Sequence, residues 1–489
     1  MDKKRAVVVG AGIAGIASAI RLSVNGYNVT IFEKNSRPGG KISEFRADGF
    51  RFDTGPSLFT LPELVDELFT LCGKNPRDYF NYSALENSCR YHYPDGTKII
   101  SWTDRERFAG ELQDKTGEPA ENTLSFLDKC RELYELTANV FIFSAFSKMK
   151  NLMTEESKKV ARNFRKLDAF STMHGVIKRH FRDERVRQLF GRYATYNGSN
   201  PYKAPGTLNV IPHLEHNTGA WFPEKGMYSV VEALVKLAGE QGIAFVYNSY
   251  VKEILTEGDM VTGIVCSDGF HEADVVVSDS DIVPLYRKLM RRSIPLWYSS
   301  RDRSTSALIF YWGVEGSFPQ FDLHNIFFSS DYPHEFRCME KGLITADPTI
   351  YLFISSRKVI SDAPAGCENW FVMINVPENR GQDWEKLIPE ARKNIIARLT
   401  RETGIDIGSI IKNESILDPR LIEEKTLSHQ GSLYGSSSNS MFSAFRRHPN
   451  HRNKYKNLLF TGGSVHPGGG IPLCLASARI AVDLLKDNQ

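Results

Sequence analysis

Three glycines and one acidic residue near the N-terminus have types and a spacing that can do chemistry. Gly10, Gly12 and Gly15 follow a short apolar run at 6–9, and Glu33 stands further along the chain. Gly10 permits a tight turn, Gly12 lets the backbone approach a pyrophosphate, and Gly15 lets a helix pack closely against a strand. Glu33 has the spacing at which an acid accepts hydrogen bonds from a ribose diol, and its charge would repel a 2′-phosphate. The pattern predicts a dinucleotide site.

The elements around these residues must bring them to one edge of a sheet. The run at 6–9 predicts a buried strand, apolar positions from Ile13 onward predict a helix that ends at Gly26, and 28–32 predicts a second strand. The first turn of the helix has free N–H groups and a partial positive charge, which suit a phosphate. The alternative for the glycines alone is an ordinary glycine-rich turn, but strand, helix and acid together favour the dinucleotide.

The next stretch bears on the choice between NAD and FAD. Residues 37–41 are Arg-Pro-Gly-Gly-Lys, and residues 49–57 are Gly-Phe-Arg-Phe-Asp-Thr-Gly-Pro-Ser. A second glycine pair and a cation beside the phosphate site suit a long, extended cofactor, and a simple NAD dehydrogenase does not need them. Here the chain resembles the superfamily of FAD-dependent amine oxidases and carotenoid desaturases. In that superfamily a GG(K/R) turn lies along the pyrophosphate, and an F-D-x-G strand passes near the flavin.

The C-terminal stretch contains a second glycine-rich turn. Residues 457–464 predict a buried strand, residues 466–472 are His-Pro-Gly-Gly-Gly-Ile-Pro, and a helix is expected at 473–485. The turn resembles the segment that lies along the isoalloxazine and ribityl chain in bacterial carotenoid desaturases of the phytoene desaturase type. Together with Gly-Ser-Leu-Tyr-Gly at 431–435, it separates the chain from amine oxidases. In addition to Gly10, Gly12, Gly15 and Glu33, the resemblance implies FAD contacts at Ala14, Lys34, Gly40, Lys41, Gly55, Pro56, Ser57, Val251, Gly463, Pro467, Gly468, Gly470, Ile471 and Pro472.

Composition excludes several classes of protein. The chain has 489 residues, of which 41% are hydrophobic and 24% charged, so it is long enough for two globular domains. Its 61 basic and 58 acidic residues are too balanced to indicate a nucleic-acid-binding protein. Its seven cysteines are scattered without a CxxC pair, which predicts reduced thiols in a cytoplasmic protein. No apolar run approaches the ~20 residues of a membrane-spanning helix, and no signal peptide is expected.

The order of the predicted elements indicates an α/β protein with interleaved domains. We expect a Rossmann-like FAD-binding domain with a parallel sheet, a substrate domain with a mixed sheet, and a helical region. Strand patterns at 306–312, 350–355 and 370–376, followed by an amphipathic helix at 384–403, predict the mixed sheet and its cover. The expected boundaries are 1–90, 220–300 and 440–489 for the FAD-binding domain, 91–120 and 301–439 for the substrate domain, and 121–219 for the helical region.

Two segments are candidates for contact with a membrane surface. Apolar side chains crowd 133–153, and Lys148, Lys150, Lys158 and Lys159 lie within or beside that stretch. A buried core helix explains this density, and so does an interfacial helix or the mouth of a lipid channel. Basic residues at 286–292 precede two aromatics, which suits either an anionic headgroup layer or a solvated loop. We expect peripheral association with the cytoplasmic side of the membrane.

The family resemblance implies FAD-dependent dehydrogenation of a polyene. A saturated C–C bond next to conjugation loses a hydride to the flavin, and the neighbouring carbon loses a proton, so the protein mainly holds the substrate in place. A proton acceptor is expected near Arg192, Tyr196 or His213, where the resemblance places a helix that borders the substrate tunnel. The other histidines lack metal-ligand spacing, and no metal site is expected. A second GxGxxG is absent from the sequence, so oxygen or a membrane quinone is the expected electron acceptor.

The sequence pattern leaves the substrate open. It is closest to the branch that introduces 3,4 double bonds into 1-hydroxycarotenoids, a long acyclic or monocyclic substrate class. Phytoene desaturation and carotenoid cis-trans isomerisation are alternatives within the same family. An amine or protoporphyrinogen oxidase is a more distant alternative, and a protein that escorts prenylated partners is a non-enzymatic one. The intact set of Gly10, Gly12, Gly15 and Glu33 argues against the escort protein.

Overall fold

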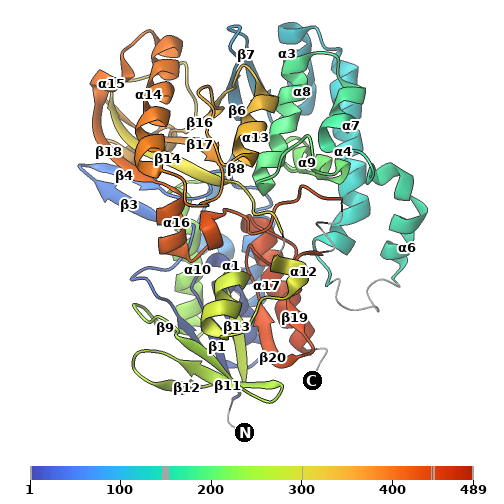
Figure 1. The fold of residues 1–489 in the computed structure, drawn as a ribbon, viewed down its shortest axis with the longest axis vertical. Coiled ribbons are helices and arrows are strands. Elements are labelled where there is room, and N and C mark those ends of the chain that lie inside the picture. The colour runs from blue at the N-terminus through green and yellow to red at the C-terminus, as the bar shows by residue number, and fades with distance from the viewer. Residues whose placement is uncertain (1–2, 146–153, 300, 442, 444–445, 487–489) are drawn as a thin grey trace.

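A six-stranded and a seven-stranded sheet lie in the two halves of the computed structural model (Figure 1). The structure describes residues 3–145, 154–299, 301–441, 443 and 446–486. Both ends of the chain lie in the half that contains the six-stranded sheet (Figure 1). The chain therefore starts and finishes in the same half and builds the other half from its middle.

The six-stranded sheet is parallel except at one edge. Its order is β19-β20-β13-β1-β2-β9, and only the pair β19–β20 is antiparallel among the described residues. The apolar run at 6–9 is buried, as a central strand covered on both faces requires. Its strands are β1 (Arg5–Val9), β2 (Asn28–Phe32), β9 (Ala244–Val246), β13 (Val275–Ser278), β19 (His451–Arg452) and β20 (Tyr455–Phe460).

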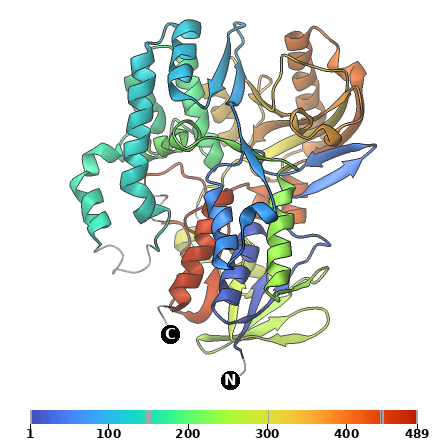
Figure 2. The ribbon, with the colours of Figure 1, turned by 180° about the vertical axis from the view of Figure 1, so that it is seen from behind.

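Helices from both ends of the chain pack together on this sheet. Figure 2 shows the red α17 (Ile471–Lys486) beside the blue α1 (Ile13–Val24), and α10 (Tyr228–Glu240) also contacts α1. A Cβ on Gly15 would stand 2.2 Å from the carbonyl oxygen of Gly10, so only glycine permits this closeness of helix and turn. Gly15 thus packs the first turn of α1 against the turn that precedes it.

A three-stranded antiparallel meander precedes β13. It consists of β10 (Glu253–Glu257), β11 (Met260–Val265) and β12 (Phe270–Glu272). The turns fall at Gly258 and Gly269, where φ is positive. The first strand begins at Glu253. The meander returns the chain to the parallel sheet at β13.

The seven-stranded sheet is mixed, as predicted. Its order is β18-β14-β17-β16-β15-β6-β7, and β15–β6 is the parallel pair within the described residues. Helix α14 (Trp384–Thr403) covers it through Trp384, Ile395 and Leu399, and Gly404 ends that helix in the left-handed region. The strands are β6 (Asn87–His92), β7 (Lys98–Trp102), β14 (Ser306–Glu315), β15 (His324–Phe327), β16 (Ile350–Phe353), β17 (Cys367–Val376) and β18 (Ile411–Leu417).

Helices from the middle of the chain flank this sheet (Figure 1). They include α3 (Arg105–Thr116), α4 (Ala120–Phe141), α6 (Glu155–Arg162), α7 (Met173–His180), α8 (Glu184–Gly191), η3 (Arg192–Asn197), η4 (Gly206–Val210) and α9 (Ile211–His216). Further elements are β3 (Glu44–Ala47), β4 (Phe50–Asp53), α2 (Glu63–Leu71), β5 (Tyr82–Ala84), β8 (Trp221–Pro223), α12 (Leu296–Ser299), α13 (Tyr332–Glu340), α15 (Ile407–Ile410) and α16 (Pro419–Thr426).

The apolar stretch at 133–153 is only partly described. Helix α4 buries Leu133, Leu136 and Val140 and ends at Phe141, and the predicted part at 146–153 lies outside the described residues. In the described ranges, no helix has the length and apolar character needed to cross a membrane. All seven cysteines are free thiols, as their scattered positions predict.

Candidate active site

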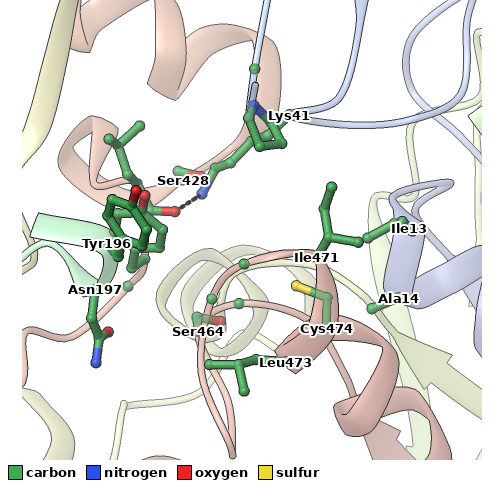
Figure 3. Close-up of a pocket in the computed structure, with 18 of the residues that line it drawn as sticks. Ile13, Ala14, Lys41, Tyr196, Asn197, Ser428, Ser464, Ile471, Leu473 and Cys474 are labelled. Carbon is green, nitrogen blue, oxygen red and sulfur yellow. Dashed lines mark hydrogen bonds between the residues drawn. The ribbon is translucent and has the colours of Figure 1, made fainter. Parts of the chain in front are cut away.

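One large cavity lies between the two halves and reaches the carboxyl ends of β1, β2 and β13. Its volume is about 1480 Å³, which exceeds the roughly 300–1,000 Å³ of a typical small-molecule pocket. Figure 3 shows Ile13 and Ala14, at the start of α1, beside Ile471 and Cys474, at the start of α17. Tyr196 lies on the opposite side (Figure 3). The cavity has room for an extended cofactor and a second molecule.

The backbone of two helix starts forms one wall of this cavity. Gly12 is the N-cap of α1 and supplies no side-chain hydrogen bond to the first turn, so a ligand can meet the N–H groups there. Gly470 lies at the start of α17 with φ +112°, and a Cβ there would enter open space rather than protein. Gly10, Ala14 and Gly470 all line the cavity. These residues fit the phosphates of a dinucleotide.

Glu33 is buried at the end of β2 and holds the loop that precedes α1. One of its oxygens accepts a hydrogen bond from the Ala11 N–H at 2.8 Å, and the other accepts one from the Asn35 N–H at 2.8 Å. The same oxygen that accepts from the Asn35 N–H also accepts from Asn35 Nδ2 at 2.8 Å. A carboxylate has about four lone-pair sites, so Glu33 Oε2 retains one acceptor site for a ribose hydroxyl. Lys34 and Val251 line the same cavity. The residues predicted for the adenosine end are thus brought together.

The Gly-Gly-Lys turn and the chain after β4 form the next part of the wall. Gly40 and Lys41 line the cavity, as do Gly55, Pro56 and Ser57. Burial lowers the pKa of Lys41, whose ammonium donates a hydrogen bond to the Leu433 carbonyl at 2.6 Å. A Cβ on Gly55 would stand 1.9 Å from the Lys41 carbonyl oxygen, so the two segments touch through their backbones.

The C-terminal turn closes the wall on the other side. Gly463, Pro467, Gly470, Ile471 and Pro472 line the cavity. Gly15 and Gly468 are not part of its described lining. Gly15 packs α1 against the turn that contains Gly10. A Cβ on Gly468 would stand 3.1 Å from the Arg447 guanidinium carbon. These two predicted residues therefore lie behind the wall.

Arg192 and Tyr196 line the cavity, but His213 lies apart from them. Arg192 Nη1 donates to the Tyr196 hydroxyl at 2.9 Å, and Tyr196 donates to Glu215. His213 stacks on Tyr134 and makes a 3.0 Å hydrogen bond with Asn217. Although burial opposes its charge, the nearby Arg192 lowers the pKa of Glu215. The structure thus adds Glu215 to the predicted pair and separates His213 from it.

Two further residues at the cavity were not predicted from the sequence. Asp279 follows β13, and its carboxylate accepts a hydrogen bond from the Gly15 N–H at 3.0 Å. Burial, and then the charge of Glu33, raise the pKa of Asp279 to about 7. Its position shortly after the apolar run at 275–277 is the signal that the sequence offers. Arg447 also lines the cavity, and burial lowers its pKa. Arg447 lies outside the motifs and gives no such signal.

A group of metal-ligating residue types lies outside the cavity. The side chains of Cys266, Asp268 and His271 on the β11–β12 hairpin bring their ligand atoms within 4.8 Å of one another. The histidine and the acid share a 3.1 Å hydrogen bond.

Comparisons with known proteins place the chain in a family. The family model described as flavin containing amine oxidoreductase matches residues 13–485. A 1-hydroxycarotenoid 3,4-desaturase from Flavobacterium sp. (strain P99-3) is 43% identical, with 99% of this chain and 100% of that protein covered. A phytoene desaturase from Fusarium fujikuroi is 32% identical, with 99% and 90% covered. A 4,4′-diapolycopene oxygenase from Methylomonas sp. is also 32% identical, with 99% and 98% covered.

Solved structures of amine oxidases share the fold. The cyclohexylamine oxidase of Brevibacterium oxydans IH-35A has a TM-score of 0.62 at 14% identity, with 99% of each chain covered. Putrescine oxidase bound to putrescine has a TM-score of 0.63 at 13% identity, with 99% of each chain covered. The predicted α/β flavoprotein fold, the FAD cofactor and the resemblance to carotenoid desaturases are confirmed. The chain belongs to the family of flavin containing amine oxidoreductases, and it is an FAD-dependent oxidoreductase.

Proposed function

We propose that the protein is a carotenoid desaturase that introduces the 3,4 double bond into 1-hydroxycarotenoids. The observation that carries this proposal is the 43% identity, over the full length of both chains, to a desaturase named for that reaction. The cavity supports it, because the glycine-rich wall is continuous with a part lined by apolar and aromatic side chains. A long polyene fits such a lining.

The chain contributes binding and orientation to this reaction. When bound along Gly12, Glu33, Lys41 and Gly470, FAD would supply the acceptor for a hydride that leaves one carbon of a saturated C–C bond as its C–H bond breaks. Apolar side chains of β14 and β17, such as Ile309 and Met373, line the cavity and exclude water from the reacting carbons. These walls hold the substrate in one orientation, which is most of what the protein must do.

A proton must also leave the carbon next to the hydride donor. The Tyr196 hydroxyl lies at the cavity wall and is hydrogen-bonded to the Glu215 carboxylate, whose pKa is lowered by Arg192 against the effect of burial. Glu215 is therefore ionised at neutral pH and can accept a proton that reaches Tyr196. This arrangement supports the pair Arg192 and Tyr196 as positioning and proton-accepting groups, with Glu215 behind them.

We also propose peripheral binding to the cytoplasmic face of a membrane and electron transfer to oxygen or a quinone. Phe164 and Met441 line the cavity and are also exposed, so apolar side chains lie where the cavity reaches the surface. Phe170 packs against Phe164 with ring centroids 5.5 Å apart and is 78% exposed. Contiguous exposed apolar side chains suit a lipid surface that delivers carotenoids.

Incubation of the flavin-loaded protein with polyenes tests the proposed reaction. A 1-hydroxycarotenoid should lose two hydrogens, and its visible absorbance should move to longer wavelength. Mass spectrometry of the product separates this loss from the gain of oxygen that an oxygenase would cause, and from the unchanged mass of an isomerase product. Phytoene and a primary amine serve as competing substrates. Turnover of the amine with no change in any polyene would contradict the proposal.

A further inference from the structure

A buried polar cluster interrupts the otherwise apolar part of the cavity. Its centre is the Arg192 guanidinium, whose carbon lies 4.6 Å from the ring centroid of Tyr193 and 5.0 Å from those of Tyr91 and Tyr196. Arg192 Nε donates to the Tyr91 hydroxyl at 2.7 Å. Glu215 balances the charge from 3.7 Å and also accepts a hydrogen bond from Tyr193. A charge in such a place is rigidly held, because each neighbour is fixed by another contact.

One phenol beside this cluster has a free hydrogen-bonding group. Tyr332, on α13, is buried and lines the cavity together with Arg192 and Tyr196. Its ring packs against Phe336, with centroids 5.0 Å apart, and against Phe328. Within the described residues the Tyr332 hydroxyl makes no hydrogen bond. Although the residue as a whole is buried, this oxygen atom is not among the fully buried polar atoms that lack a partner. The hydroxyl is therefore accessible from the cavity and available to a ligand.

The cluster is also close to the cofactor side of the cavity. Arg447 Nη2 donates a 3.0 Å hydrogen bond to Asn197 Oδ1, and a Cβ on Gly468, in the turn before α17, would stand 3.1 Å from the Arg447 guanidinium carbon. Figure 3 shows Tyr196 and Asn197 across the cavity from Ser464 and Ile471. Both Asn197 and Ser464 line the cavity. A group bound at the cluster would thus lie near the carbons that react with the cofactor, rather than at the remote end of a long substrate.

We propose that Tyr332, with Arg192 and Tyr196, forms a subsite for a hydroxyl group on the end of the substrate. This inference rests on the proposed function and deepens it, because it names the group that the site selects. In a 1-hydroxycarotenoid, two C–C bonds separate the hydroxyl-bearing carbon from the C3–C4 bond. A hydroxyl held at the cluster therefore fixes which bond faces the cofactor. In apolar pockets, a small number of precisely placed polar groups commonly fixes the orientation of the ligand.

The same cluster disfavours a substrate that ends in a hydrocarbon. Such an end would cover the Tyr332 hydroxyl without offering it a hydrogen-bond partner, which is unfavourable. The subsite therefore selects hydroxylated carotenoids in two ways, by binding the hydroxyl and by penalising its absence.

The test compares Tyr332→Phe with Tyr134→Phe in the flavin-loaded, full-length protein. Both tyrosines line the cavity, and neither hydroxyl has a hydrogen-bond partner within the described residues, but Tyr134 lies on α4, where it stacks on His213. The probes are a 1-hydroxylated acyclic carotenoid and its non-hydroxylated parent, each in detergent. For each probe we would measure the apparent Kd, kcat/KM and the position of the new double bond.

Tyr332→Phe should reduce the preference for the hydroxylated probe by about five- to tenfold, both in binding and in kcat/KM, because one hydrogen bond is lost. It should also increase the share of products with a double bond at another position. Tyr134→Phe should keep the wild-type preference. An unchanged preference in Tyr332→Phe, or an equal loss in both variants, would overturn the subsite.

The measurements separate this inference from the proposed function. If the wild type desaturates both probes without preference, the desaturase proposal stands and the subsite is wrong. If the wild type desaturates neither probe but binds the hydroxylated one more tightly in a way that needs Tyr332, the subsite stands and the reaction is wrong. If neither probe binds, both proposals fail.

Discussion

The cofactor wall and the substrate wall of the cavity are built by different means. The cofactor wall consists of backbone at the starts of α1 and α17, where Gly12 and Gly470 leave N–H groups and space for a ligand. The substrate wall consists of side chains, with aromatic and apolar groups around the cluster of Arg192 and Glu215. A backbone wall depends on glycine at fixed positions, whereas a side-chain wall depends on which distant residues the fold brings together.

This difference predicts that the backbone packing directly behind the cofactor wall tolerates an added methyl group less well than the side-chain wall does. In Gly15→Ala the Cβ would stand 2.2 Å from the Gly10 carbonyl oxygen, so α1 must move away from the phosphate turn. We expect a loss of roughly 3 kcal/mol in FAD retention, about 100-fold, measured by the flavin absorbance of the protein after dialysis. Gly110→Ala on α3 is the matched control, because a Cβ there meets no atom within 4 Å. Equal flavin content in the two variants would show that the close packing has no role.

Glu33 gives a smaller but sharper test of the same wall. Glu33→Ala removes a ribose acceptor and also the hydrogen bonds to Ala11 and Asn35. We expect FAD retention to weaken by about 1–3 kcal/mol, as the loss of hydrogen bonds to a charged group does. Glu33→Gln keeps one acceptor oxygen and should lie between the wild type and Glu33→Ala. Titration of flavin-free protein with FAD measures all three, and an unchanged affinity in Glu33→Ala would remove Glu33 from the ribose site.

The two walls also differ in how far they could be predicted from the sequence. The elements of the cofactor wall carry their signals locally, because Gly10, Gly12, Gly15 and Glu33 lie within one strand-turn-helix-strand unit. The extent of α14 was predicted to the residue, since an apolar period and Gly404 mark it. The substrate wall has no local signal, because its residues come from separate elements. Tyr332 and Glu215 acquire their roles only when α13 and α9 meet η3.

A buried acid in the cofactor wall, Asp279, should make stability depend on pH. Burial raises the pKa of Asp279 to about 7, and of the charges that face it Glu33 raises this pKa while Lys41 lowers it. The folded protein therefore binds a proton that the unfolded chain has already lost, and the stability this gives below about pH 4 disappears as pH rises through about 7.

Asp279→Asn should remove this dependence. From pH 5 to pH 8 the melting temperature of the wild type should fall relative to that of the variant by roughly 2–4 °C, measured by circular dichroism. Asp114→Asn, at an exposed position on α3, is the matched control. If the melting temperatures of Asp279→Asn and Asp114→Asn depended on pH in the same way, the buried carboxyl of Asp279 would not be the cause of the pH dependence.

The smallest expected effect concerns the rim of the substrate wall, where the proposed membrane contact lies. Phe170→Glu places a charge beside Phe164 at the opening of the cavity. Burying that charge in the headgroup layer is unfavourable, so we expect a two- to fivefold loss of binding to anionic vesicles, roughly 0.5–1 kcal/mol. Ile360→Glu is the control, because Ile360 is 85% exposed but belongs to the half with the seven-stranded sheet and does not line the cavity. Co-sedimentation with vesicles measures both. If Ile360→Glu weakened vesicle binding as much as Phe170→Glu, the membrane would contact the protein somewhere other than Phe170. The cavity would then open into water rather than into the lipid surface.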